Sequence, residues 1–495
     1  MLLSVPNEIL NRIAFEADSR TRRRLRRTCQ LLRDVATPLV FESVNINLSW
    51  RRHSSSAPTF LKSLNSGPKL AQHIIHLSLC LPQSFRPYPS RFASEARKKT
   101  RDERLDSFDA LFLGAISSMV SLKSLFWMSD GESGPHYAKL MFELFGNLPL
   151  LSKLKIHGYG NWDVPLSPFR HIRHISFLGQ RSNELITFLG YNPDIEIIDA
   201  FVWSRSIDDD QSGSISWLFS CLPTGTYSTV KTLRIGGEML RQLYAYEIPK
   251  FIPHLRHLES LTTLINVPDV LWDGLQEHGI CLVSLSYHEP TLALLSYLSS
   301  YTGLRELSLN MSSDPTNGTL HIASLLPAVI TLNSSSLTTV RIVPCHSGAW
   351  CLDHPMLDAL ALCRGLKSLH VCADKARTRV EENNVIDRLL QAFLALWPNL
   401  WDLQIDAVSR SYGFEAVRTT ASQIHRRILA LRFAPLSPER PKVHVSSDFA
   451  AYSVIIHDQK NNIHSFKVQY LRHYGEKESW RKYKFWRRSD NTNDD

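Results

Sequence analysis

The stretch LRELSL at residues 304–309 consists, in order, of an apolar residue, two variable residues, a second apolar residue, one variable residue and a third apolar residue. This pattern recurs twelve times, and after a first gap of 48 residues the repeats are spaced 21 to 35 residues apart. Repetition at such a period is typical of stacked structural repeats. The central apolar residues of the twelve copies are Leu77, Leu125, Leu154, Ile175, Ile198, Leu233, Leu264, Leu285, Leu307, Val340, Leu369 and Leu403.

The residues on either side of these twelve anchors test whether each copy is a strand. In a strand with one buried face, the neighbours of a buried residue point the opposite way. Of the twenty-four flanking residues, all are polar except Phe126, Ile197 and Ile265. The anchors therefore indicate strands with one apolar and one polar face.

Helix-length apolar patterns lie between the predicted strands, at residues 105–119, 138–148, 270–278, 291–301 and 385–397. Strand and helix alternating at this spacing predict parallel strands joined by right-handed crossovers. The arrangement resembles an irregular leucine-rich-repeat solenoid, while a parallel α/β arrangement without solenoid curvature is the alternative. Polar interruptions at residues 82–104, 206–214, 311–319 and 374–384 are expected to project as loops.

Two amino-terminal segments precede the repeats. VPNEILNRI at residues 5–13 predicts a short amphipathic helix that begins at Pro6, and TCQLLRDVATPLVF at residues 28–41 continues a second apolar set. About forty residues rarely make a stable core alone. These helices are therefore expected to need a partner surface.

The two segments resemble the F-box motif, in the form common in fungal F-box proteins. The family implies a small helical bundle that binds a Skp-type adaptor and, through it, a cullin-RING ubiquitin ligase. The segment departs from the family at Val5, where leucine is usual, and at residues 20–27, which hold six arginines. Capping helices of the repeat domain are the alternative interpretation. Carried over by position, the adaptor-binding residues are Pro6, Ile9, Leu10, Ile13, Leu25, Cys29 and Leu32.

The sequence thus predicts an α/β chain in four parts. Residues 1–48 form the helical F-box motif, and residues 49–408 form the leucine-rich-repeat-like solenoid. Residues 409–475 form a C-terminal helix and β cap, because a solenoid must cover its last open repeat. Residues 476–495 form a basic and aromatic tail that we predict to be disordered.

The resemblance implies a non-catalytic substrate receptor, with the polar strand face holding an unknown protein substrate. The alternative is a repeat scaffold that binds proteins without a ubiquitin-ligase role. Cations on that face would suit an anionic or phosphorylated segment, and an aromatic residue would anchor it. The candidate substrate-binding residues are Phe126, Lys153, Lys155, Arg234 and Arg341.

Composition narrows the remaining function classes. The net charge of +9 is concentrated in residues 1–52 and 480–488, which contribute +5 each, so the body of the chain does not indicate a nucleic-acid surface. No apolar run is long enough for a membrane helix, and no signal-peptide core follows the first methionine. Eight scattered cysteines are typical of reduced thiols. We expect a cytoplasmic or nuclear protein with no membrane partner.

No catalytic or cofactor motif is present. Gly236 and Gly237 lack the further glycine and lysine of a phosphate-binding loop. The acidic run Asp208–Asp210 is more typical of a solvated loop than of a cation site. No zinc spacing is matched by Cys345, Cys351, His354, Cys363 and Cys372. The sequence therefore predicts no enzyme activity, no cofactor and no metal.

Overall fold

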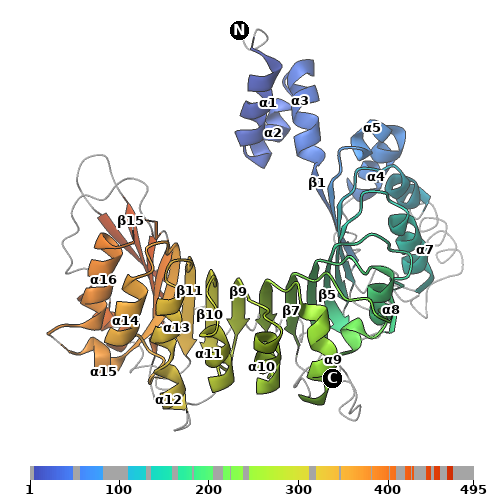
Figure 1. The fold of residues 1–495 in the computed structure, drawn as a ribbon. Coiled ribbons are helices and arrows are strands. Elements are labelled where there is room, and N and C mark those ends of the chain that lie inside the picture. The colour runs from blue at the N-terminus through green and yellow to red at the C-terminus, as the bar shows by residue number, and fades with distance from the viewer. Residues whose placement is uncertain are drawn as a thin grey trace, which may run out of the picture. The chain divides into compact units, whose positions relative to one another are not determined.

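The computed structural model of the chain divides into two compact units, residues 1–257 and 258–495, which are described separately (Figure 1). The described residues are 5–47, 56–81, 110–129, 135–158, 165–180, 183–203, 216–222, 224–237, 245–311, 319–344, 347–380, 382–397, 399–400, 402–408, 419–424, 426–427, 442–447, 451–457 and 465–471. The acidic run at 208–210, the cysteine at 345 and the tail at 476–495 lie outside them. So does the whole of the predicted 82–104 loop.

The first unit begins with three short helices, α1 (Asn7–Glu16), α2 (Ser19–Leu25) and α3 (Gln30–Phe41). Asp18 starts α2 by accepting a hydrogen bond from the Thr21 backbone N–H at 2.7 Å. The bundle's interior consists of small and branched apolar side chains from α1 and α3, namely Leu10, Ala14, Leu32 and Ala36. The bundle adjoins the solenoid at the end of α3, where the Phe41 ring stacks on Phe60 at a centroid distance of 6.2 Å.

Parallel strands follow, hydrogen-bonded in chain order. They are β1 (Ser43–Asn47), β2 (His76–Leu81), β3 (Ser124–Ser129), β4 (Lys153–Gly158), β5 (His174–Gln180), β6 (Ile197–Trp203) and β7 (Thr232–Gly236). Strand β1 was not anticipated, and it places Val44 beside the first anchor, Leu77. From there the anchors form one continuous row across the strands.

Helices of this unit lie on one side of its strands (Figure 1). They are α4 (Ser56–Ser66), α5 (Pro68–Ala71), helical residues 110–117, α7 (Pro135–Gly146), α8 (Asn183–Tyr191), η3 (Ser216–Phe219), η4 (Ala245–Glu247), α9 (Ile248–Phe251) and η5 (Ile252–Leu255). Their apolar side chains pack on the buried face of the strands, as Phe142 does on Trp127 with ring centroids 4.7 Å apart. The core therefore lies between strands and helices.

The second unit repeats this plan. Its strands are β8 (Ser260–Thr263), β9 (Ser284–Tyr287), β10 (Glu306–Met311), β11 (Thr339–Pro344), β12 (Ser368–Asp374), β13 (Asp402–Val408), β14 (Lys442–Ser447), β15 (Ala451–His457) and β16 (Ser465–Leu471). Its helices are α10 (Asp269–Glu277), α11 (Leu292–Leu298), α12 (Thr319–Ala323), α13 (Leu326–Leu332), α14 (His354–Ala361), α15 (Lys375–Thr378), α16 (Val385–Ala395) and helical residues 419–424. Strands β8 to β14 are parallel, whereas β15 and β16 are antiparallel to their neighbours. The chain is thus an α/β solenoid of the leucine-rich-repeat kind.

One anchor was placed wrongly. Every predicted anchor except Leu264 is buried, whereas the Leu264 side chain is 51% exposed. Strand β8 ends at Thr263, whose hydroxyl accepts a hydrogen bond from the Ile265 backbone N–H at 3.2 Å. The buried anchor is Leu261, three residues earlier, which pairs with Leu285. The apolar residues that follow the end of β8 match the anchor pattern by sequence, which is why the pattern predicts Leu264 as the anchor.

A recurring side-chain clamp connects the start of a strand to the helix that follows it. In three repeats, the backbone N–H three residues before the anchor donates to a side chain that lies in the following helix or directly after its last residue. Ile172 donates to Asn192 at 3.0 Å, and Leu304 donates to Asn333 at 3.1 Å. Leu282 donates to the Tyr297 hydroxyl at 3.3 Å. Because these groups are buried, each clamp satisfies a donor that water cannot reach.

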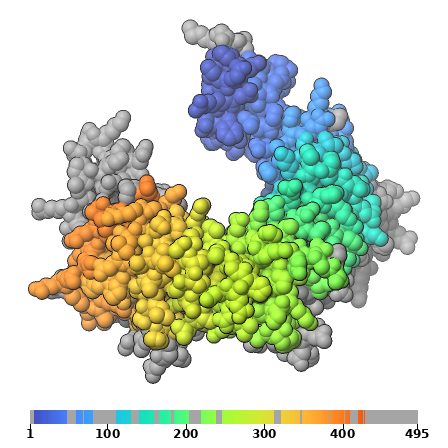
Figure 2. All heavy atoms as spheres, viewed as in Figure 1, coloured from blue at the N-terminus to red at the C-terminus, as the bar shows by residue number. Residues whose placement is uncertain are grey.

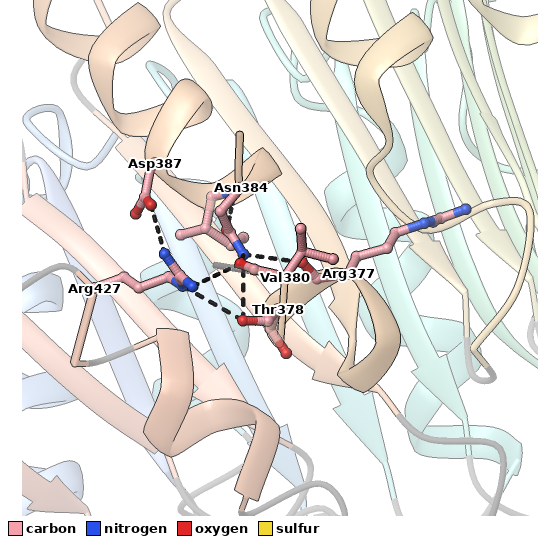
Figure 3. A network of polar contacts seen from close by, with 7 residues as sticks. Arg377, Thr378, Val380, Asn384, Asp387 and Arg427 are labelled. Atoms are coloured by element: carbon pink, nitrogen blue, oxygen red, sulfur yellow. Dashed lines mark hydrogen bonds and ion pairs between the residues drawn. The ribbon is translucent and has the colours of Figure 1, made fainter. Parts of the chain in front are cut away.

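The segment at residues 374–384 does not project as a free loop, contrary to the sequence expectation. It contains α15, and buried Asn384 donates from its amide nitrogen to the carbonyls of Arg377 and Val380 at 3.0 and 2.6 Å (Figure 3). Arg427 donates to the Val380 carbonyl at 2.8 Å and lies 2.5 Å from an Asp387 oxygen. Hydrogen bonds of Asn384 and Arg427 therefore connect α15, α16 and the residues that follow the helix at 419–424.

Candidate functional site

Helix α1 carries two apolar stripes with different environments. Leu10 and Ala14 are buried against α3, whereas Ile9 and Ile13 are 51% and 49% exposed. Residues four apart share one helical face, and each residue is turned about 100° from its neighbour. The bundle thus completes its own core and leaves a second apolar stripe in solvent. Helix α1 contributes to the dark blue surface in Figure 2.

The predicted adaptor-binding residues divide accordingly. Leu10 and Leu32 are 1% and 8% exposed and lie in the bundle's interior, so little of either side chain is accessible to a partner. Pro6 is exposed at the start of α1, and Leu25 and Cys29 are half-buried. The exposed stripe is therefore centred on Ile9 and Ile13.

The arginines of residues 20–27 have two structural roles that the sequence did not reveal. Arg22 donates from Nε to the Ala14 carbonyl at 3.0 Å and from Nη2 to the Phe15 carbonyl at 2.5 Å. These are carbonyls of the last turn of α1, which have no partner within the helix. Arg26 lies over the Phe41 ring at 4.8 Å. The bundle tolerates this basic segment because part of it caps and packs the helices.

The second candidate surface is the polar strand face of the first unit. Strand register places Phe126 beside Lys155, and Lys153 beside His174. The Lys155 ammonium lies 5.4 Å from the Phe126 ring centroid, and the His157 ring meets Phe126 edge-on at 4.8 Å. We call Phe126, Lys153, Lys155, His157 and His174 the unit 1 strip. Neither histidine was among the predicted residues.

The histidines of the strip are held toward the neutral form. Burial, together with the nearby Lys155 charge, lowers the pKa of His157 to about 4. Burial and Lys153 also lower the pKa of His174, against an opposing effect of Asp199. Both rings therefore act at neutral pH as uncharged hydrogen-bonding groups beside two cations.

Arg234 belongs to the same face, further along the sheet. It is exposed and stands next to Asp199 in register, and Asp199 accepts a hydrogen bond from the Ser176 hydroxyl at 3.3 Å. Among the described residues, Lys153, Lys155 and Arg234 form no ion pair. The structure thus brings four of the five predicted substrate-binding residues onto one face.

Arg341, the fifth predicted residue, belongs to the second unit. Its Nε donates to the Asn310 side chain at 3.2 Å. Nearby on this unit's polar face, His370 Nε2 and Asp406 Oδ2 lie 2.7 Å apart, and Gln404 donates to Asp406 Oδ1 at 3.0 Å. His370 is 6% exposed. The polar groups here are satisfied by one another, an arrangement that depends on register and was not anticipated.

No metal-binding cluster occurs among the described residues, which exclude Cys345. Burial raises the pKa of the Cys351 and Cys363 thiols to about 12, so neither is activated for nucleophilic chemistry. Within the same part of the chain, no helix is long and apolar enough to cross a membrane.

The sequence matches no protein-family model and no curated protein. Among solved structures, the chain is similar to one described as the crystal structure of the Rad7 and Elc1 complex in yeast. The two chains are 15% identical, and the alignment covers 88% of this chain and 91% of the other with a TM-score of 0.41. This distant likeness supports no inference about function.

Proposed function

We propose that this protein is the substrate-recognition subunit of a Skp-cullin-F-box ubiquitin ligase. Its helical bundle docks on a Skp-type adaptor, and the polar strand face holds a protein substrate. The chain catalyses nothing itself but raises the effective concentration of a substrate lysine near the ubiquitin-charged enzyme. The observation that carries the proposal is the stripe of Ile9 and Ile13, exposed on a bundle whose core is complete without them.

The exposed stripe has an energetic cost that a partner would remove. Covering the exposed half of each isoleucine contributes about 1 kcal/mol per residue. Exposed Pro6, directly before the first residue of α1, adds to the exposed apolar surface of this helix. Neighbouring contacts that exclude water strengthen such central anchors. An F-box docking surface needs this combination of a self-supporting bundle and an uncovered apolar stripe.

The test is binding of the full-length chain to purified Skp-type adaptor. The variant Ile9→Asp/Ile13→Asp is expected to bind more than tenfold more weakly, because it places two charges in the interface. Leu10→Asp is unsuitable, since it buries a charge in the bundle's core and unfolds it. The matched control is Leu292→Asp/Leu362→Asp, whose leucines are 50% and 52% exposed in the second unit.

The control variant should bind the adaptor as the unchanged chain does. If the unchanged chain shows no affinity for any Skp-type adaptor, the ligase role is refuted. A repeat scaffold that binds proteins without ubiquitin ligase is then the better description. If binding survives Ile9→Asp/Ile13→Asp, the adaptor uses another surface and the stripe is not the docking site.

A further inference from the structure

We propose that the unit 1 strip, Phe126, Lys153, Lys155, His157 and His174, binds an acidic segment of a partner protein that also presents a large apolar side chain. The inference rests on the proposed function, because it names the substrate class of the same strand face. It comes from three features of the strip: its charges, its apolar border and the lack, among the described residues, of an ion pair to either of its lysines.

The strip carries cations that the described part of the chain does not neutralise. Lys153, Lys155 and Arg234 contribute three positive charges to the strand face, and Asp199 contributes one negative charge, so the net charge is +2. Asp199 already accepts a hydrogen bond from Ser176. The complementary ligand is therefore anionic, and carboxylates can pair with lysine ammonium groups from several directions.

An apolar row borders these cations. In register with His157, the neighbouring strands place Met128 on one side and Leu178 on the other, and Phe201 follows Leu178. All four side chains are half-buried. Apolar atoms on a strand's open face gain free energy when a partner covers them. A ligand that pairs with Lys155 thus has room for a large apolar side chain beside its acid.

The alternative of nucleic acid fits this surface less well. Single-stranded nucleic acid needs a basic groove along its backbone with aromatic rings for successive bases. The strip offers Phe126 as one such ring, but the Lys155 ammonium lies over it and His157 packs against its edge. A short acidic peptide needs no free aromatic ring, because its carboxylates can pair with Lys153 and Lys155 on the open side of the strands.

The probe is the fluorescein-labelled peptide Glu-Glu-Leu-Glu-Glu-Phe-Glu-Glu, titrated with the full-length chain at low ionic strength. Lys153→Gln/Lys155→Gln is expected to weaken binding about tenfold. The matched control is Arg173→Gln/Lys231→Gln, which removes two cations of the same unit that flank Glu196. A peptide with glutamine for every glutamate, and one with alanine for leucine and phenylalanine, should each bind more weakly.

A spectroscopic readout separates local contact from general attraction. An acidic ligand beside Lys155 should raise the pKa of His157 from about 4 toward its ordinary value, as followed by imidazole NMR signals. The control double variant should show the same shift. The proposal is overturned by no binding at about millimolar peptide, by equal binding of the glutamine peptide, by an unaffected lysine variant, or by preference for oligothymidylate.

Failure of this inference is distinguishable from failure of adaptor docking. Ile9→Asp/Ile13→Asp leaves the strip unchanged and should bind the peptide normally. Lys153→Gln/Lys155→Gln leaves the bundle unchanged and should bind the adaptor normally. Adaptor binding without peptide binding refutes the strip alone, and the reverse result refutes the docking stripe alone.

Discussion

The polar strand faces of the two units have the same repeat geometry but use their polar side chains differently. In the second unit, carboxylates are paired within the face: Glu306 with Ser284, Asp402 with Ser368, and Asp406 with His370. In the first unit, Lys153 and Lys155 have no carboxylate partner among the described residues. A polar solenoid face is therefore not uniformly a binding surface. Groups that satisfy one another stabilise the fold, whereas unmatched charges are available to a partner.

Among the variants proposed for the two strand faces, we expect the largest change in the free energy of unfolding at Asp406. Asp406→Ala leaves nearly buried His370 and the Gln404 amide without their shared acceptor. We expect the free energy of unfolding, measured by urea denaturation, to fall by about 2–3 kcal/mol. Asp402→Ala, on the same strand, removes only a 3.1 Å hydrogen bond from Ser368 and should cost about 1 kcal/mol or less. Equal losses in the two variants would contradict an interior role for the His370 pair.

A smaller effect is expected from pH, at His157. Its pKa is about 4 in the folded chain and near 6.5 when unfolded, so the unfolded state binds more protons between these values. The contribution of neutral His157 to the free energy of unfolding is therefore complete above pH 6.5 and is lost as pH falls toward 4. The loss should be at most about 2 kcal/mol, since water still reaches the half-buried ring. His157→Gln should flatten this part of the stability profile measured by urea denaturation, and an unchanged slope would show that other groups cause it.

The smallest expected effect is that of the unmatched lysines on stability. Lys153→Gln/Lys155→Gln should change the free energy of unfolding by no more than about 0.5 kcal/mol, because neither side chain has an ion pair to lose. The measurement is the same urea titration used for Asp406→Ala. A loss above about 1 kcal/mol would mean that the strip is structural, like the face of the second unit.

The amino-terminal bundle shows how far residue pattern could predict a binding surface. The pattern correctly indicated that α1 is amphipathic, because the apolar spacing of a helix is visible in its own residues. It could not separate Ile9 from Leu10, which are adjacent and have side chains of the same size and similar hydrophobicity. Only the packing of α3 decides which of them is buried. The role of Arg22 was equally hidden, since its acceptor carbonyls belong to another helix.

The repeated strand with one buried face could be identified from the sequence alone. Burial of every second side chain is a local requirement, so the anchors could be found without knowing their neighbours, except where the turn at Leu264 copied the pattern. The tertiary structure decided how the polar groups combine. The pairing of His370 with Asp406 and the grouping of Phe126 with Lys155 join residues 36 and 29 positions apart on neighbouring strands. Such pairs depend on the register between successive strands, and no single repeat contains that information.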